Sequence, residues 1–237
     1  GWRTAMLLGA TVAVPVFLLF WLRIHQTPPA RPDLTMRSRF ELEPLSELLA
    51  RPEIRYTTLM AIGGAFCWQA TASFLPAFLI EHHGRSVSMA SVLFSMYFVV
   101  HGLTQPVLGA LSDRMGRDGA AAIAFGTGVV GYGTLVAIPD GPAVFVAVPL
   151  VGVAMSWGAP VQSRFIDHLG ESERAAGFGL VRTVYMLLGA LGSVIVGGLA
   201  DIAGWPVAFG LLVALLAAEL LLVVGPHLRR LSRPIAR

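Results

Sequence analysis

Residues 87–138 read VSMASVLFSMYFVVHGLTQPVLGALSDRMGRDGAAAIAFGTGVVGYGTLVAI. Two long apolar runs, 87–111 and 119–138, flank a short charged stretch whose core is SDRMGRD at 112–118. Each run has the roughly 20 apolar residues that a helix needs to cross a bilayer core of about 30 Å. Because backbone groups in lipid must bond within their own segment, we predict two transmembrane helices joined by a tight hairpin.

The same pattern continues on both sides of this hairpin. Five further apolar runs of spanning length lie at 4–22, 56–80, 142–163, 175–200 and 205–225. Hydrophobic residues make up 55% of the chain and charged residues 13%, against roughly 25% charged in ordinary globular domains. The predicted fold class is all-α, a polytopic membrane bundle of seven transmembrane helices. A disordered or nucleic-acid-binding chain is excluded.

One connection between the spans is long. Residues 23–55 carry five prolines and charges of both signs, which predicts an extended linker followed by a short amphipathic helix near 44–51. All 17 basic residues are arginines, and 15 of them fall on the side of this linker, of the 112–118 hairpin and of the C-terminal tail. The positive-inside rule therefore predicts that the linker and the C-terminus are cytoplasmic and that the chain is a multi-pass protein of the cell (inner) membrane.

Residue types that are rare or absent exclude several classes of protein. The sequence has no lysine, which excludes Schiff-base enzymes and retinal proteins. Cys67 is the only cysteine, so neither a disulfide framework nor a cysteine zinc cluster is expected. There is no phosphate-binding P-loop sequence, which argues against ATP-driven transport. We expect no cofactor, no metal, no nucleic-acid partner and no catalytic residue.

The hairpin resembles the cytoplasmic-loop signature of the major facilitator superfamily, G-x-x-x-D-[RK]-x-G-[RK]-[RK]. The matching positions are Gly109, Asp113, Arg114, Gly116 and Arg117. The last signature position departs from the pattern, because it is the acidic Asp118. Residues 173–180 and 197–205 resemble the family's entry into its eleventh helix and the exit into its twelfth.

The resemblance implies an organisation for the whole chain. Residues 1–22 correspond to the last helix of the N-terminal half, 23–55 to the central cytoplasmic linker, 56–226 to the six-helix C-terminal half and 227–237 to a cytoplasmic tail. The implied function is secondary transport of a small solute by alternating access, coupled to a gradient, with a proton as one candidate ion. The implied partners are the lipid bilayer, a small-molecule substrate and N-terminal helices of the same transporter, so the chain is expected to be a fragment.

Physical chemistry gives separate expectations for the hairpin. Gly116 is expected to take a positive φ in the turn, and Gly109 to allow close helix approach. Asp113 stands near a helix C-terminus, where a carboxylate is unfavourable, so it should pair with an arginine or with the N-terminus of another helix.

Polar side chains within the spans are the candidates for a substrate path, because each needs a partner or a cavity in the membrane. Tyr97, His101 and Gln105 recur every four residues and share one helix face. They line a path or make interhelical hydrogen bonds, and His101 is a candidate proton carrier. Gln69, Trp157 and Gln162 are further candidates, with packing as the alternative.

Two charged residues lie deep in their spans. Arg182 is seven residues into its run, where it either extends to the cytoplasm or binds an anionic substrate. Glu219 is a candidate for an ion pair with Arg182 or Arg164, or for a coupling-proton site. We favour a structural role for Glu219, because the resemblance gives its helix no usual role in transport.

Other functions remain open from sequence alone. A seven-helix receptor-like protein fits the number of spans but leaves the hairpin signature without a role. An intramembrane hydrolase needs a nucleophile paired with a base. His101 is available as the base, but no serine in the sequence is evidently its partner. A third alternative is a non-transporting fragment.

Overall fold

The computed structural model describes residues 2–24, 43–139, 141–171 and 173–231, and every regular element in these ranges is a helix. The chain divides into two compact units, Gly1–Glu41 and Leu42–Arg237. Seven stretches within the described ranges are long and apolar enough to cross a membrane. This confirms the predicted all-α class with seven membrane-spanning helices.

The first unit contains α1, Trp2–Arg23. Its described side chains are all exposed, and the helix is apolar on every side. A helix that is hydrophobic all round is typical of a membrane span, which agrees with the predicted run at 4–22. The predicted linker lies mostly outside the described residues.

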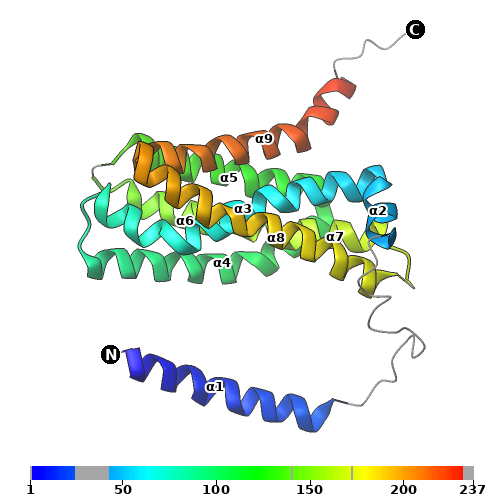
Figure 1. Ribbon diagram of the computed structural model, residues 1–237, viewed down its shortest axis with the longest axis horizontal. Helices are drawn as coiled ribbons and strands as arrows, with labels where there is room; N and C mark the ends of the chain where they lie inside the picture. Colours follow the sequence, from blue (N-terminus) through cyan, green and yellow to red (C-terminus); the bar gives the residue numbers. More distant parts are fainter. Residues whose placement is uncertain (1, 25–42, 140, 172, 232–237) are drawn as a thin grey trace. The chain divides into compact units, whose positions relative to one another are not determined.

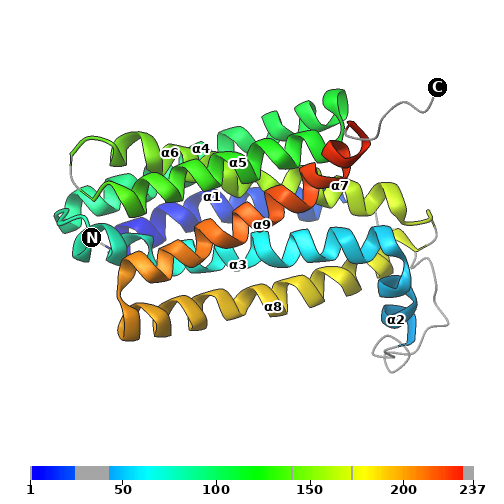
Figure 2. The same cartoon turned by 90° about the horizontal axis from the view of Figure 1, so that it is seen from above.

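The second unit is a bundle of long helices that run along one axis (Figure 1). The elements in chain order are α2 Glu43–Ala50, α3 Pro52–Glu81, α4 Val87–Met115, α5 Arg117–Ala137, α6 Val144–Ala154, the 3₁₀ turn η2 Met155–Trp157, α7 Gly158–His168, α8 Arg174–Ala203 and α9 Trp205–Leu231. Figure 2 shows α2 running across one end of this bundle, and its bounds confirm the short helix predicted near 44–51.

Helix α3 holds the centre of the bundle, in contact with α4, α7, α8 and α9. Small residues permit its closest approach, which is to α8. A Cβ added to Gly189 on α8 would lie 2.5 Å from the Ala65 Cβ on α3. The two backbones are therefore so close that only glycine fits at this position. This is the packing expected in lipid, where dispersion contacts replace the hydrophobic effect between helices.

Several helices extend past the predicted runs. Helix α3 begins at Pro52 rather than 56, and α9 continues to Leu231, into the predicted tail. The run predicted at 142–163 is interrupted by η2 and continues to His168 as α7. Pro160 explains part of this break, because it has no N–H to donate to the carbonyl four residues earlier. Helix α4 continues to Met115 rather than ending at 111, since the polar residues 112–115 form its last turn outside the apolar run.

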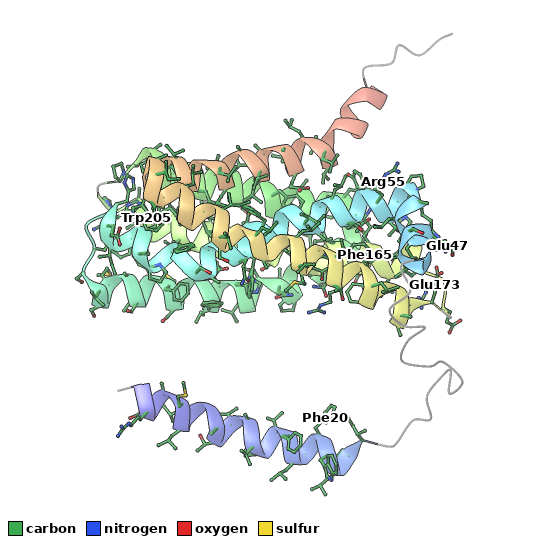
Figure 3. The ribbon with its side chains drawn as sticks, viewed as in Figure 1. Phe20, Glu47, Arg55, Phe165, Glu173 and Trp205 are labelled. Atoms are coloured by element: carbon green, nitrogen blue, oxygen red, sulfur yellow. The ribbon has the colours of Figure 1, made fainter. Side chains whose placement is uncertain are left out.

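Hydrogen bonds hold the end of the bundle that contains the α3–α4 and α5–α6 connections. The buried His83 side chain donates its Nδ1–H to the carbonyl of Pro139 at 2.7 Å. Burial lowers the pKa of His83, which keeps the imidazole neutral at pH 7. At the same end the indole N–H of Trp205 donates to the Glu81 carboxylate at 2.8 Å. Figure 3 places Trp205 at the end of the bundle opposite Glu173.

Candidate functional site

A cavity of about 200 Å³ opens between α3, α4, α7 and α8. Five of the seven residues predicted for a substrate path line it: His101, Gln105, Trp157, Gln162 and Arg182. Trp68, Met155, Tyr185 and Met186 line it too. The cavity thus combines one cation and two carboxamides with aromatic and thioether surfaces, the mixture expected of a small-molecule site.

Two carboxamides of the cavity lining lie close to Gly158. A Cβ added to Gly158 would lie 3.3 Å from Gln162 Nε2 and 3.7 Å from Gln105 Nε2. Gly158 begins α7 directly after the 3₁₀ turn, so both amides lie near the point where the helix is interrupted. Each amide can donate and accept hydrogen bonds.

Arg182 supplies the positive charge of the cavity. Its guanidinium Cζ lies 6.0 Å from the ring centroid of Phe178, one turn earlier on α8. No carboxylate in the described part of the chain lies within salt-bridge distance of it. The ion pair considered between Arg182 and Glu219 is therefore not formed. An arginine without a counter-charge is available to an anionic ligand.

Trp157 is part of the cavity wall and packs against α3. Its side chain is only 6% exposed. A Cβ added to Gly64 would lie 2.5 Å from two of its ring carbons, so this glycine makes room for the indole. The η2 turn carries Trp157 and orients it toward α3, with Tyr185 of α8 at 6.4 Å in an edge contact.

Two predicted path residues lie outside the cavity wall. Tyr97 is fully buried and stacks on His101 with a ring-centroid distance of 6.4 Å. Gln69 follows the cavity residue Trp68 on α3 but is not part of the lining. Their roles in a path stay predictions.

A small hydroxyl cluster contacts His101, and sequence reasoning missed it. The Ser156 Oγ atom lies 3.4 Å from His101 Nδ1 and 2.7 Å from the Thr104 hydroxyl. It also donates to the backbone carbonyl of His101 at 3.2 Å. A nucleophile–base pair needs about 2.6–3.2 Å and an exposed nucleophile, whereas Ser156 is completely buried. This cluster ties α4 to the η2 turn.

The signature hairpin forms a charge network around Arg117, at the start of α5. Arg117 donates from Nε to Asp167 on α7 at 2.8 Å and from Nη1 to the Ser112 hydroxyl at 3.0 Å. It also pairs with Asp113, four residues earlier. The prediction that Asp113 pairs with an arginine is therefore confirmed. Asp167 was not predicted, because it lies 50 residues further along the sequence.

The two hairpin glycines differ in their roles. Gly116 has φ = 93°, as predicted, and it both ends α4 and precedes α5. The expectation for Gly109 was wrong, because a Cβ there would lie 3.8 Å from the Ala159 Cβ, an ordinary contact distance. Arg114 is exposed at the last turn of α4, where a cation is favourable beside the carbonyl end of the helix.

A second network centres on Arg164 of α7. This guanidinium donates to Glu53 on α3 at 2.8 Å, pairs with Asp118 on α5 and lies 4.8 Å from the ring centroid of Tyr56. It therefore joins three helices and is not paired with Glu219. Asp118, the position that departs from the family signature, is explained here as a partner of Arg164.

A third ion pair anchors α2. Arg51 donates to Glu173 at 2.5 Å, and the backbone N–H of Gly170 donates to the same carboxylate at 2.9 Å. These two hydrogen bonds lower the pKa of Glu173. Figure 3 shows Glu47 and Glu173 near each other at this end of the bundle, which we call the charged end.

A second hollow lies between the cavity and the charged end. It measures about 250 Å³ and is lined by Arg117, Gln162, Ser163, Ile166, Asp167 and Phe178. Gln162 lines both spaces, so its side chain lies between the cavity and the hollow beside Arg117.

Comparisons with known proteins agree with this architecture. The family model described as Major Facilitator Superfamily matches residues 57–236. Among curated proteins, the chain is similar to the alpha-ketoglutarate permease of Escherichia coli (strain K12), with 27% identity over 142 residues, which are 58% of this chain and 29% of the permease.

Solved structures share the fold. The POT family transporter PepTSo superimposes with a TM-score of 0.65 and 17% identity, covering 75% of this chain and 37% of that one. A bacterial homolog to the human lysosomal transporter Spinster, in an inward-facing and unoccupied conformation, superimposes with a TM-score of 0.55 and 18% identity. This match covers 94% of this chain and 57% of that one.

Each of these relatives is longer than the matched region. The chain spans less than two thirds of the length of the permease and of both transporter structures. The family match covers most of the bundle and includes the signature hairpin, the cavity, the Arg117 network and Arg164 with its partner Asp118. The chain is an integral, multi-pass membrane protein that belongs to the Major Facilitator Superfamily.

Proposed function

We propose that this chain forms one half of a secondary transporter that carries a small organic anion across the cell membrane by alternating access. The observation that carries the proposal is Arg182, a cation in the cavity wall with no carboxylate of the described residues within salt-bridge distance. The similar permease is named for alpha-ketoglutarate, a dicarboxylate, which supports the same chemical class.

Energetics favour an anionic ligand at this place. An arginine within a membrane span costs roughly 2.5–3.5 kcal/mol on insertion scales unless it finds water or a partner. A substrate carboxylate satisfies the planar donors of the guanidinium. Gln105 and Gln162 offer amide N–H donors for further oxygens, and Trp157 covers the hydrocarbon part of the ligand.

The proposed transporter has the organisation that the sequence suggests. Residues 56–226 form one six-helix half, residues 1–22 belong to the other half, and residues 23–55 connect the two. Because the charged end of the bundle carries the arginine-rich connections, we assign it, the linker and the tail at 227–237 to the cytoplasmic side of the inner membrane. The substrate path runs between the two halves, and a solute or proton gradient drives it.

The test uses the protein expressed from its complete reading frame and reconstituted in liposomes. Counterflow of labelled mono- and dicarboxylates is measured beside a neutral solute of similar size. We expect Arg182→Ala to reduce anion transport by about 10–100-fold, since hydrogen bonds to charged groups are worth about 1.5–3 kcal/mol.

The matched control is Arg174→Ala, which removes an arginine from the same helix but outside the cavity. It should leave counterflow within about twofold of the unmodified protein, a change of less than 0.5 kcal/mol. Equal losses for anionic and neutral solutes in Arg182→Ala, or equal losses in the two variants, would refute the assignment of an anion to this cavity.

A further inference from the structure

One partly buried acidic side chain lies outside both the cavity and the arginine networks. Glu219 is on α9, within the span Trp205–Gly225. Its Oε2 atom is buried and has no hydrogen-bond partner among the described residues. Its Oε1 atom lies against Gly63 of α3, where an added Cβ would collide with it.

No described cation neutralises this carboxyl group. On α3, the neighbouring titratable groups are Tyr56, whose hydroxyl donates to the carbonyl of Leu222 at 3.2 Å, and the buried thiol of Cys67. Arg164 lies over the Tyr56 ring but is paired with other carboxylates.

The other two helices that pack against α9 contribute no counter-charge. On α5 the contacts are apolar, with Leu216 against Gly128 and Leu220 near Gly126, and Asp118 of this helix is paired with Arg164. On α8 the charged residues Arg174, Arg182 and Asp201 are exposed. An unpaired carboxylate in such surroundings is strongly disfavoured, whereas the protonated acid is tolerated.

Consecutive residues of α3 connect this group to the cavity. Gly63 receives the Glu219 carboxyl, Gly64 receives the indole of Trp157 with 2.5 Å between an added Cβ and the ring, and Ala65 lines the cavity. A movement of α3 at Gly63 therefore changes the wall of the cavity two residues away.

We propose that Glu219 is a proton-binding site at the α3–α9 interface and that its occupancy is coupled to the cavity through Gly63, Gly64 and Trp157. The protonated carboxyl packs on Gly63 in the conformation seen here. When the proton leaves, the carboxylate withdraws toward water and α3 shifts relative to Trp157. The coupling to transport rests on the proposed function, but the protonation of Glu219 does not.

The first experiment tests protonation without transport. The unfolding equilibrium of the full protein in detergent is measured from pH 5 to pH 9 for the unmodified protein, for Glu219→Gln and for Glu171→Gln, the same change on an exposed loop residue. A folded state that holds a proton which the unfolded state releases loses stability as pH rises. We expect the ratio of the unmodified protein's folding constant to that of Glu219→Gln to fall by up to tenfold per pH unit.

Glu171→Gln should follow the unmodified protein throughout. Gly63→Ala displaces the carboxyl and should flatten the pH dependence as Glu219→Gln does. Parallel pH curves for the unmodified protein and Glu219→Gln overturn the proposal. So does failure of Glu219→Gln to fold, because glutamine is isosteric with the protonated acid.

The second experiment tests coupling. In liposomes with an imposed pH gradient, Glu219→Gln should lose gradient-driven accumulation of the substrate by tenfold or more while it retains counterflow. Accumulation at the unmodified level refutes the coupling. Absence of counterflow in the unmodified protein refutes the proposed function instead, and the unfolding experiment still decides whether Glu219 binds a proton.

Discussion

Replacing Gly64 by alanine should destabilise the bundle, because the added methyl collides with Trp157. The new Cβ would lie 2.5 Å from two ring carbons of the indole and 3.0 Å from a third. The indole cannot move aside easily, since it is 6% exposed and has Tyr185 at its edge. The methyl must therefore displace either a rigid aromatic ring or the backbone of α3.

The magnitude follows from two opposing effects. Alanine is favoured over glycine in a helix by about 0.8–1 kcal/mol. Overpacking a filled core typically costs about 1–3 kcal/mol, and a rigid neighbour at 2.5 Å places Gly64→Ala near the upper end. We expect a net loss of about 2 kcal/mol in the free energy of unfolding.

Gly133 on α5 supplies a matched control, because nothing lies within 4 Å of its added Cβ. Gly133→Ala should change the free energy of unfolding by no more than about 1 kcal/mol, in the stabilising direction. Both variants are compared by denaturant unfolding in mixed micelles, alone and combined with Trp157→Leu. The cycle between Gly64→Ala and Trp157→Leu should show a coupling energy of about 1–2 kcal/mol. Equal stability of the two alanine variants, or additivity in the cycle, would refute the steric argument.

Three further predictions concern the charged end. Arg164→Ala leaves Asp118 without its partner and should lower the free energy of unfolding by about 1–3 kcal/mol, measured by denaturant unfolding in micelles. Glu173 has a lowered pKa, so its pairing with Arg51 stabilises the fold above the ordinary glutamate value of 4.5 and is lost as pH falls through the folded value. Thermal unfolding from pH 7 down to pH 3 should show this acid loss, and Glu173→Gln should lack it. Asp113→Asn removes the carboxylate that pairs with Arg117 and should reduce transport in liposomes severalfold, whereas full activity would contradict a role for the hairpin network.

The fold could be predicted largely from sequence, because a span leaves a local signal of length and apolarity. The exception is the turn at Met155–Trp157, which lies inside a continuous apolar run. Hydropathy does not register a break there, since Pro160 and Gly158 are apolar or neutral and also occur within unbroken membrane helices. The continuation of α7 to His168 was not predicted, because the last turn of this helix is polar and lies outside the apolar run.

The candidate site, too, could be predicted only where the sequence carries a local signal. Five of the cavity residues were predicted because a polar or indole side chain stands out in an apolar run. Met155, Tyr185 and Met186 were not predicted. The pairing of Asp113 with Arg117 was predictable because the two residues are four apart on adjoining helical turns. The partners of Arg164 were not, since Glu53 lies 111 residues away in sequence and charge alone does not select a partner.

The two ends of the bundle are held by interactions that respond differently to dissolved ions. At the charged end, Arg51 and Glu173 are an exposed pair of full charges, and salt screens such pairs over about 8 Å at physiological ionic strength and about 3 Å at 1 M. At the other end, the buried bond from neutral His83 to the carbonyl of Pro139 has little net charge to screen. Raising the ionic strength should therefore weaken the Arg51–Glu173 pair more than the His83–Pro139 hydrogen bond at the other end.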